Sequence, residues 1–109
     1  MAKLQPWKPA DATDEIRKLA RSDKLNLTFS GHARDQLDIR DLFIGDASYV
    51  LKHGFVYEHP VEATRPGLFK YRIESRSPNS GNRIVRVIAV PDPGANLIKL
   101  VTVMWKDEK

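Results

Sequence analysis

The sequence of 109 residues contains no cysteine. This absence excludes a disulfide framework, a thiolate metal site and a cysteine nucleophile. The sequence also lacks a long apolar run, so we expect no signal peptide, no segment that crosses a bilayer and a cytoplasmic location. The sequence also has no glycine-rich phosphate loop, no Gly-x-Ser-x-Gly elbow and no Rossmann fingerprint. It therefore contains none of the common motifs from which a reaction could be identified.

Hydrophobic residues make up 41% of the chain, which is enough for the core of one domain. The length leaves no room for a second domain. We expect residues 1–24 to form an N-terminal extension with one helix, and residues 25–109 to form a single α+β domain. Apolar residues at helical spacing predict this first helix over 12–22, with Asp11 or Thr13 as its cap.

Helix and turn signals follow in the first half of the domain. Alternation of apolar and polar residues predicts a short strand over 25–29. Ser30 is placed to cap a helix over 31–40. A third short helix is expected over 46–53, with Gly54 in the left-handed conformation that ends many helices.

The second half has the pattern of a β-meander. Strands are expected at 55–57, 69–74, 83–90 and 97–105, separated by turns rich in proline and glycine. Helices that precede a sheet in this way indicate an α+β fold. We therefore predict two to three N-terminal helices packed on one face of a four-stranded, mainly antiparallel sheet.

The opposite face of this sheet is expected to be basic. Alternation in the second strand directs Tyr71 and Ile73 toward the helices and Lys70 and Arg72 outward. Arg86 on the next strand falls on the same outer face. For the last strand the pattern leaves two possibilities, with either Thr102 or its two neighbours facing outward.

Positive charge is concentrated in one segment. The whole chain has 18 lysines and arginines against 14 acidic residues, whereas residues 65–86 have six cations against the single carboxylate of Glu74. Such a stripe is the footprint of an anionic partner, above all nucleic acid. The alternative is a solvated sheet face that discourages aggregation. The six cations are Arg65, Lys70, Arg72, Arg76, Arg83 and Arg86.

Residues 28–33, Thr-Phe-Ser-Gly-His-Ala, resemble the opening of a widespread bacterial domain of unknown function, DUF4258. That family begins with a short strand followed by Ser-x-His-Ala on a helix. The resemblance extends over about 27–105 and leaves the first helix outside. The further matching segments are Arg40, 44–47, 50–54, 70–73, 83–90 and 100–105.

The layout of this family is similar to that of RelE/ParE-type toxins and related small ribonucleases. In those folds RNA or an antitoxin peptide engages the sheet. The resemblance therefore implies a toxin-like protein that binds RNA or cleaves it as a metal-independent ribonuclease, without a cofactor. The alternative is a non-catalytic module that binds an acidic, antitoxin-like protein or nucleic acid.

Cleavage of RNA without a metal requires a base, an acid and cations near the phosphate. His32, at the start of a helix, is the candidate base or acid. Its alternative role is structural, with the imidazole bonded to a backbone carbonyl. Arg72 and Arg86 are the expected catalytic cations. The further residues expected to contact RNA are Arg40, Lys70, Arg83 and Thr102.

Two of these expectations have alternatives of their own. Arg40 stands near the end of its helix, where it could instead form a salt bridge with Asp38 or Asp41. A cluster of His53, Glu58 and His59 lies close together in the sequence, but without the spacing of a metal site. We expect no bound metal.

Overall fold

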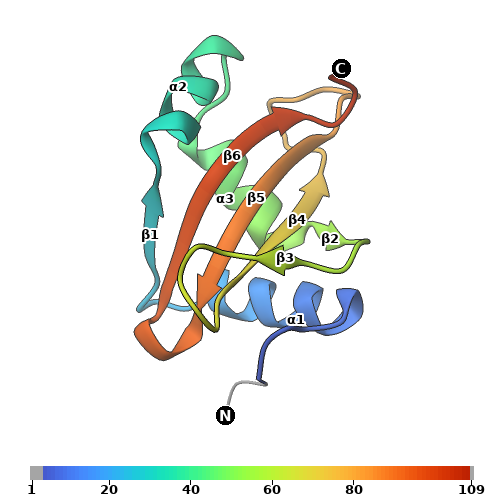
Figure 1. Ribbon diagram of the computed structural model, residues 1–109. Helices are drawn as coiled ribbons and strands as arrows, with labels where there is room; N and C mark the ends of the chain where they lie inside the picture. The colour runs from blue at the N-terminus through green and yellow to red at the C-terminus, as the bar shows by residue number, and fades with distance from the viewer. Residues whose placement is uncertain (1–3, 109) are drawn as a thin grey trace.

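The computed structural model describes residues 4–108 and has an α+β fold, as predicted. This part of the chain has three α-helices and six strands, which are labelled in Figure 1. The elements are α1 (Pro9–Ala20), β1 (Asn26–Phe29), α2 (Gly31–Ile39), α3 (Ile44–His53), β2 (Phe55–Val56), β3 (Val61–Glu62), β4 (Phe69–Ser75), β5 (Val85–Asp92), a 3-10 turn (Pro93–Ala95) and β6 (Leu97–Trp105). Residues 1–3 of the expected extension lie outside the described residues.

The sheet has the strand order β1-β6-β5-β4-β2, and β3 pairs separately with β4. All pairs are antiparallel except that of β1 with β6. The prediction of four strands is too low for two reasons. β1 joins the sheet by parallel pairing with β6, and β3 forms where a loop was expected.

The helices and the sheet share one hydrophobic core. In Figure 1, α3 lies behind the sheet, α1 crosses its lower end, and β3 lies in front. Ile16 of α1 is fully buried together with Ile73 and Val87 of the sheet. The ring of Trp7 stacks on Tyr71, and the backbone N–H of Trp7 donates to the Tyr71 hydroxyl. The segment before residue 25 is therefore part of the packed core.

The start of α1 differs from the prediction. The helix begins at Pro9, and Lys8 takes the capping position without a side-chain hydrogen bond. Proline suits the first helical position because its missing N–H would have no partner there. Asp11 and Thr13 lie inside the helix, so their assignment as caps was wrong. The Thr13 hydroxyl accepts from the Val56 N–H and thereby ties α1 to β2.

Helix α2 follows the prediction at its start. The Ser30 hydroxyl accepts from the Ala33 N–H at 3.0 Å, as expected for a cap. At the other end, Asp41 takes the left-handed conformation with φ 53°. The Leu42 N–H then donates to the Leu37 carbonyl, which completes a Schellman motif.

Gly54 at the end of α3 does not have the left-handed conformation that was predicted, because its φ is −79°. The structure requires glycine there for space. A Cβ atom would lie 2.5 Å from the Val50 carbonyl oxygen and 2.9 Å from Cγ1 of Ile73. Glycine therefore allows α3 to pack closely against β4.

Side chains of α2 protect the exposed edge of β6. β1 pairs with β6 only as far as Leu100, and α2 continues along the edge beyond it. The Ser30 hydroxyl donates to the Val101 carbonyl, and Oε1 of Gln36 accepts from the Val103 N–H. These bonds satisfy backbone groups that would otherwise be open to another strand.

A β-bulge settles the orientation of the last strand. Ile88 pairs with Thr102 and Ala89 pairs with Leu100, so Val101 is an extra residue. Thr102 and Val101 both lie on the outer face, while Val103 is fully buried. The sequence offered these as alternatives because the alternation rule does not anticipate a bulge.

Candidate nucleic-acid interface

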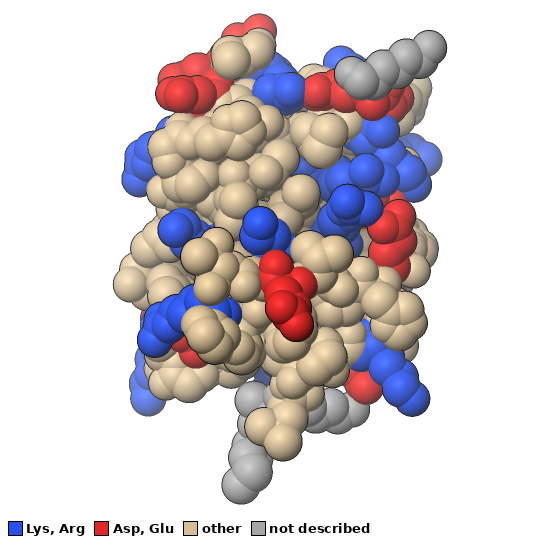
Figure 2. Space-filling model, in the orientation of Figure 1, with Lys and Arg blue, Asp and Glu red and all other residues tan. Residues whose placement is uncertain are grey.

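The outer face of the sheet carries two hollows. The first, of about 130 Å³, is named the carboxylate pocket and is lined by Tyr57, Glu58, Arg72, Glu74, Arg86 and Lys106. The second, of about 300 Å³, is named the lysine groove and lies between the sheet and the segment 63–68. Its lining includes Arg65, Leu68, Lys70, Val90, Leu97 and Lys99. Figure 2 shows this face, where lysine and arginine side chains gather most densely at the upper right.

Glu74 is the centre of the carboxylate pocket. It lies directly opposite Arg86 in the pairing of β4 with β5, and the Arg86 Nε donates to Glu74 Oε2 at 2.8 Å. The Lys106 ammonium lies 2.7 Å from Glu74 Oε1. These two cations cover the carboxylate, which is only 6% exposed although it belongs to the outer face.

The pKa of Glu74 reflects this environment. Burial disfavours the charged form, but the hydrogen bonds from Lys106 and Arg86 outweigh it, and the pKa of Glu74 lies below its usual range. Glu74 is therefore ionised at neutral pH. It holds Arg86 and Lys106 as partners.

Arg72 has a looser partner. Its Nη1 lies 2.7 Å from Glu58 Oε2, with about half of each side chain exposed. An ion pair so accessible to water contributes little to stability and exchanges easily with other charges. Tyr57 beside it is 65% exposed, and the Lys106 ammonium lies 5.6 Å from the centre of its ring. Another anion can therefore replace Glu58 as the partner of Arg72 with little loss of free energy.

The lysine groove differs in its charges. Lys70 on β4 and Lys99 on β6 stand on either side of Val90 of β5. The side chain of neither lysine has an ion pair or hydrogen bond with any other residue in 4–108. Arg65, on the segment that covers the groove, lies 3.8 Å from Asp92 and remains 75% exposed.

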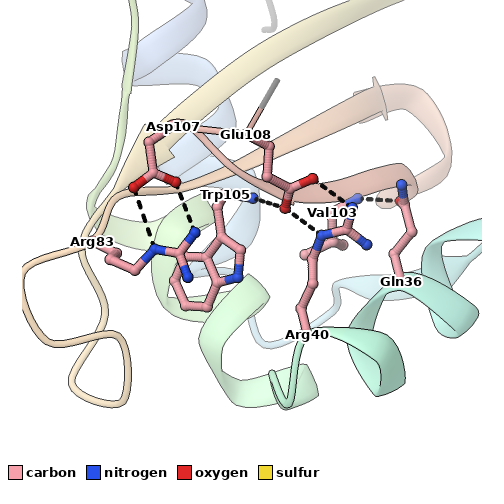
Figure 3. A network of polar contacts seen from close by, with 7 residues as sticks. All are labelled: Gln36, Arg40, Arg83, Val103, Trp105, Asp107 and Glu108. Carbon is pink, nitrogen blue, oxygen red and sulfur yellow. Dashed lines mark hydrogen bonds and ion pairs between the residues drawn. The ribbon is translucent and has the colours of Figure 1, made fainter.

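Arg40 forms a salt bridge with Glu108 near the C-terminus (Figure 3). Its Nε and Nη2 donate to the two carboxylate oxygens of Glu108 at 2.5 and 2.6 Å. The salt bridge proposed with Asp38 or Asp41 is therefore made with Glu108 instead. Hydrogen bonding from Arg40 lowers the pKa of Glu108 to about 2.

Arg83 forms a similar pair with Asp107, the residue before Glu108. Its guanidinium binds both oxygens of Asp107 and lies 4.0 Å from the centre of the Trp105 indole (Figure 3). Arg40 and Arg83 line neither the carboxylate pocket nor the lysine groove. Of the candidates for RNA contact, the structure places Lys70 in the groove and these two arginines around the C-terminal segment.

The side chain of His32 is exposed at the first turn of α2 and makes no hydrogen bond or ion pair within residues 4–108. Neither hollow includes it in its lining. Helix α2 borders β6, so β6 and β5 lie between it and the strand that carries Arg72. Thr102 faces outward in register with Ile88 but lines neither hollow. The structure brings Arg72 and Arg86 together, and His32 stands apart from them.

Two of the six cations of the hollows, Lys99 and Lys106, were not among the sequence candidates, and Glu58 was considered only for a metal site. Glu58 and Lys106 lie outside the long strands, where periodicity gives no orientation. Lys99 carried a usable signal, because it is the single cation within the apolar strand 97–105.

Within residues 4–108, no group of three histidine or acidic side chains could hold a metal ion. The ring of His53 packs against that of Tyr49 in a tilted arrangement, with ring centres 4.3 Å apart, and Glu58 faces Arg72. In the same range, the helices are too short or too polar to cross a membrane.

A family model described as a domain of unknown function, DUF4258, matches residues 29–105. The chain belongs to the DUF4258 family. This membership confirms the resemblance that opens at residues 28–33, and the match includes both hollows except for Lys106. Helix α1 lies outside the DUF4258 match, although its residues complete the core. Searches of curated proteins and of solved structures find no match to this chain.

Proposed function

We propose that this DUF4258 protein is a toxin-like protein of the cytoplasm that binds RNA through the outer face of its sheet. One observation supports the proposal. The two hollows together contain six cations and three carboxylates, an excess of three, while the formal excess of the whole chain is four. The cations are Arg65, Lys70, Arg72, Arg86, Lys99 and Lys106, and the carboxylates are Glu58, Glu74 and Asp92.

The shape of the face favours a single strand of RNA over a duplex. Proteins that bind single strands combine a basic groove with aromatic platforms on which bases stack. Lys70 and Arg72 point outward two residues apart on β4, about 7 Å along the strand. Tyr57 and Phe55 present exposed rings beside the carboxylate pocket. A flexible strand can follow these recessed sites, whereas a rigid duplex would contact only their rims.

The geometry supports binding more directly than cleavage. Cleavage requires an acid or base within hydrogen-bond reach of the phosphate. His32, the acid–base candidate of the sequence, lines neither hollow. An acidic protein partner would use the same cations, and it would then compete with RNA for this face.

The proposal is tested by fluorescence anisotropy with a short labelled single-stranded RNA. We expect binding that weakens steeply between about 50 and 200 mM salt, because phosphate contacts release counterions. Arg72→Glu should weaken binding by about tenfold or more, since it reverses a charge on the face. The matched control is Lys18→Glu, an identical charge change on α1, away from this face.

Two results would overturn the proposal. The first is a wild-type protein that does not bind the RNA at about 50 mM salt. The second is a Lys18→Glu variant that loses as much affinity as Arg72→Glu, since binding would then follow net charge alone. Electrophoresis of the same RNA with a chelator present would reveal metal-independent cleavage, and His32→Ala would test whether this histidine is responsible.

A further inference from the structure

The lysines of the lysine groove differ from most of the cations that line the two hollows or lie near the C-terminus. Five others, on the outer face and near the C-terminus, each contact a carboxylate within 2.8 Å. These are Arg40, Arg72, Arg83, Arg86 and Lys106. Lys70 and Lys99 have no such partner within residues 4–108. The carboxylate of the groove, Asp92, faces Arg65. Two like charges held on one face repel each other, and a bound anion would relieve that repulsion.

The positions of the two lysines suit a single anionic group. One strand, β5, separates β4 from β6, so their backbones lie about 10 Å apart. Val90 occupies the space between them and pairs with Lys99. Flexible four-carbon stems allow both ammonium groups to converge over Val90. A phosphate at this point would receive hydrogen bonds from both sides.

Apart from Arg65 and Asp92, which face each other, and the hydroxyls of Ser30 and Thr64, the remainder of the groove is apolar. Leu97 and Val101 form its floor beside Val90, and Leu68 belongs to the segment that covers it. Its volume of about 300 Å³ is at the lower end of the range for small-molecule sites. Inorganic phosphate would leave most of this apolar surface uncovered. The groove therefore fits an anion that carries a flat, largely apolar group.

We propose that the lysine groove holds one unstacked nucleotide of the bound RNA, an inference that rests on the proposed function. The phosphate lies between Lys70 and Lys99, and the base lies against Leu68 and Leu97. Single-stranded RNA is recognised through such splayed bases, and the planar guanidinium of an arginine can stack on them. Arg65, on the covering segment, is exposed and placed to do so.

The first test uses AMP as a probe with isotopically labelled wild-type protein. AMP should shift the backbone amide signals of residues 64–70 and 97–101. It should also compete with the labelled RNA at a lower concentration than inorganic phosphate does. Equal competition by phosphate and AMP would overturn the assignment of a base to the apolar part.

The second test compares the double variant Lys70→Ala/Lys99→Ala with the control Lys18→Ala/Lys24→Ala, which removes the same charge elsewhere. Removal of the groove lysines should weaken RNA binding by about tenfold or more and reduce the salt slope by about two. It should also abolish the shifts caused by AMP. Thermal unfolding of both variants verifies that they are folded.

The outcomes separate the groove from the proposed function. If wild-type protein binds RNA and both double variants bind it equally, the groove proposal is overturned while RNA binding stands. If wild-type protein fails to bind RNA but AMP still shifts the groove residues, the proposed function is overturned and the groove is a site for free nucleotides.

Discussion

The carboxylate pocket and the lysine groove lie on the same face of the sheet, yet their cations are in different states. In the pocket, Arg72 and Arg86 each hold a carboxylate within 2.8 Å. In the groove, Lys70 and Lys99 hold none within residues 4–108. An anion that enters the pocket must displace a carboxylate, whereas one that enters the groove meets free ammonium groups. The number of cations on a face is thus a poor measure of its capacity to bind phosphate.

The cost of displacement also varies within the pocket. Glu58 is more than half exposed, so water can solvate it when Arg72 turns to another anion. Glu74 is almost buried, and it would keep only one of its two cationic partners, Lys106, if Arg86 left it. The cations therefore form a series from the free lysines through Arg72 to Arg86. Sequence reasoning treated Arg72 and Arg86 as equivalent, and the structure separates them.

The largest expected effect is at the buried carboxylate. Glu74→Gln removes the charge that holds Arg86 and Lys106, and it should lower the free energy of unfolding by about 3 kcal/mol. Chemical denaturation measures this loss. The same change frees two cations on the outer face, so anisotropy should show tighter RNA binding by the folded variant. Stability and affinity are expected to change in opposite directions.

The control for this variant is Glu62→Gln, on exposed β3, which makes no ion pair within residues 4–108. It should leave the free energy of unfolding within about 0.5 kcal/mol of the wild-type value. If Glu74→Gln lowered the free energy of unfolding no more than this control does, Glu74 would not stabilise the pocket. Paired and free cations would then not differ in the way proposed above.

A smaller effect is expected at Glu108, the partner of Arg40 outside both hollows. The folded-state pKa of Glu108 is about 2, which is below its usual value of 4.5. Stability from this pair is therefore present above about pH 4.5 and is lost as the pH falls toward 2. Glu108→Gln should lower the free energy of unfolding by about 2 kcal/mol at neutral pH. The difference between wild type and variant should shrink on acidification.

Denaturation curves at several pH values check this expectation. A difference that stayed constant from neutral pH to about pH 2 would mean that the charge of Glu108 is not the source of stability. RNA affinity serves as the second measurement. It should be unchanged in Glu108→Gln, because Arg40 lines neither hollow.

Local patterns predicted much of the fold because they depend on neighbouring residues alone. Alternation correctly directed Tyr71 and Ile73 inward and Arg72 outward. Ser30 was identified as a cap from its position before a helix, and the structure confirms it. Family membership was likewise predicted from short motifs whose order is specific.

The pairing of charges could not be predicted in the same way. Glu74 meets Arg86 because of the register between β4 and β5, which depends on the turn that joins them. Lys106 comes close to Glu74 because β6 pairs with β5 and ends near the carboxylate, which is also a matter of strand pairing. The bulge at Val101 likewise arises from strand pairing. Sequence reasoning therefore located the basic face but not the carboxylates that neutralise part of it.

The smallest expected effect distinguishes a loose pair from a tight one. Glu58→Gln should change the free energy of unfolding by less than about 1 kcal/mol, because the pair with Arg72 is half exposed. It nevertheless frees one cation, so the salt slope of RNA binding should steepen by up to about 1. Affinity at low salt should rise accordingly, and Glu62→Gln again provides the control. Equal behaviour of Glu58→Gln and Glu62→Gln would show that Arg72 does not contact the RNA. Binding would then depend on the lysine groove, and the paired arginines would be left with a structural role.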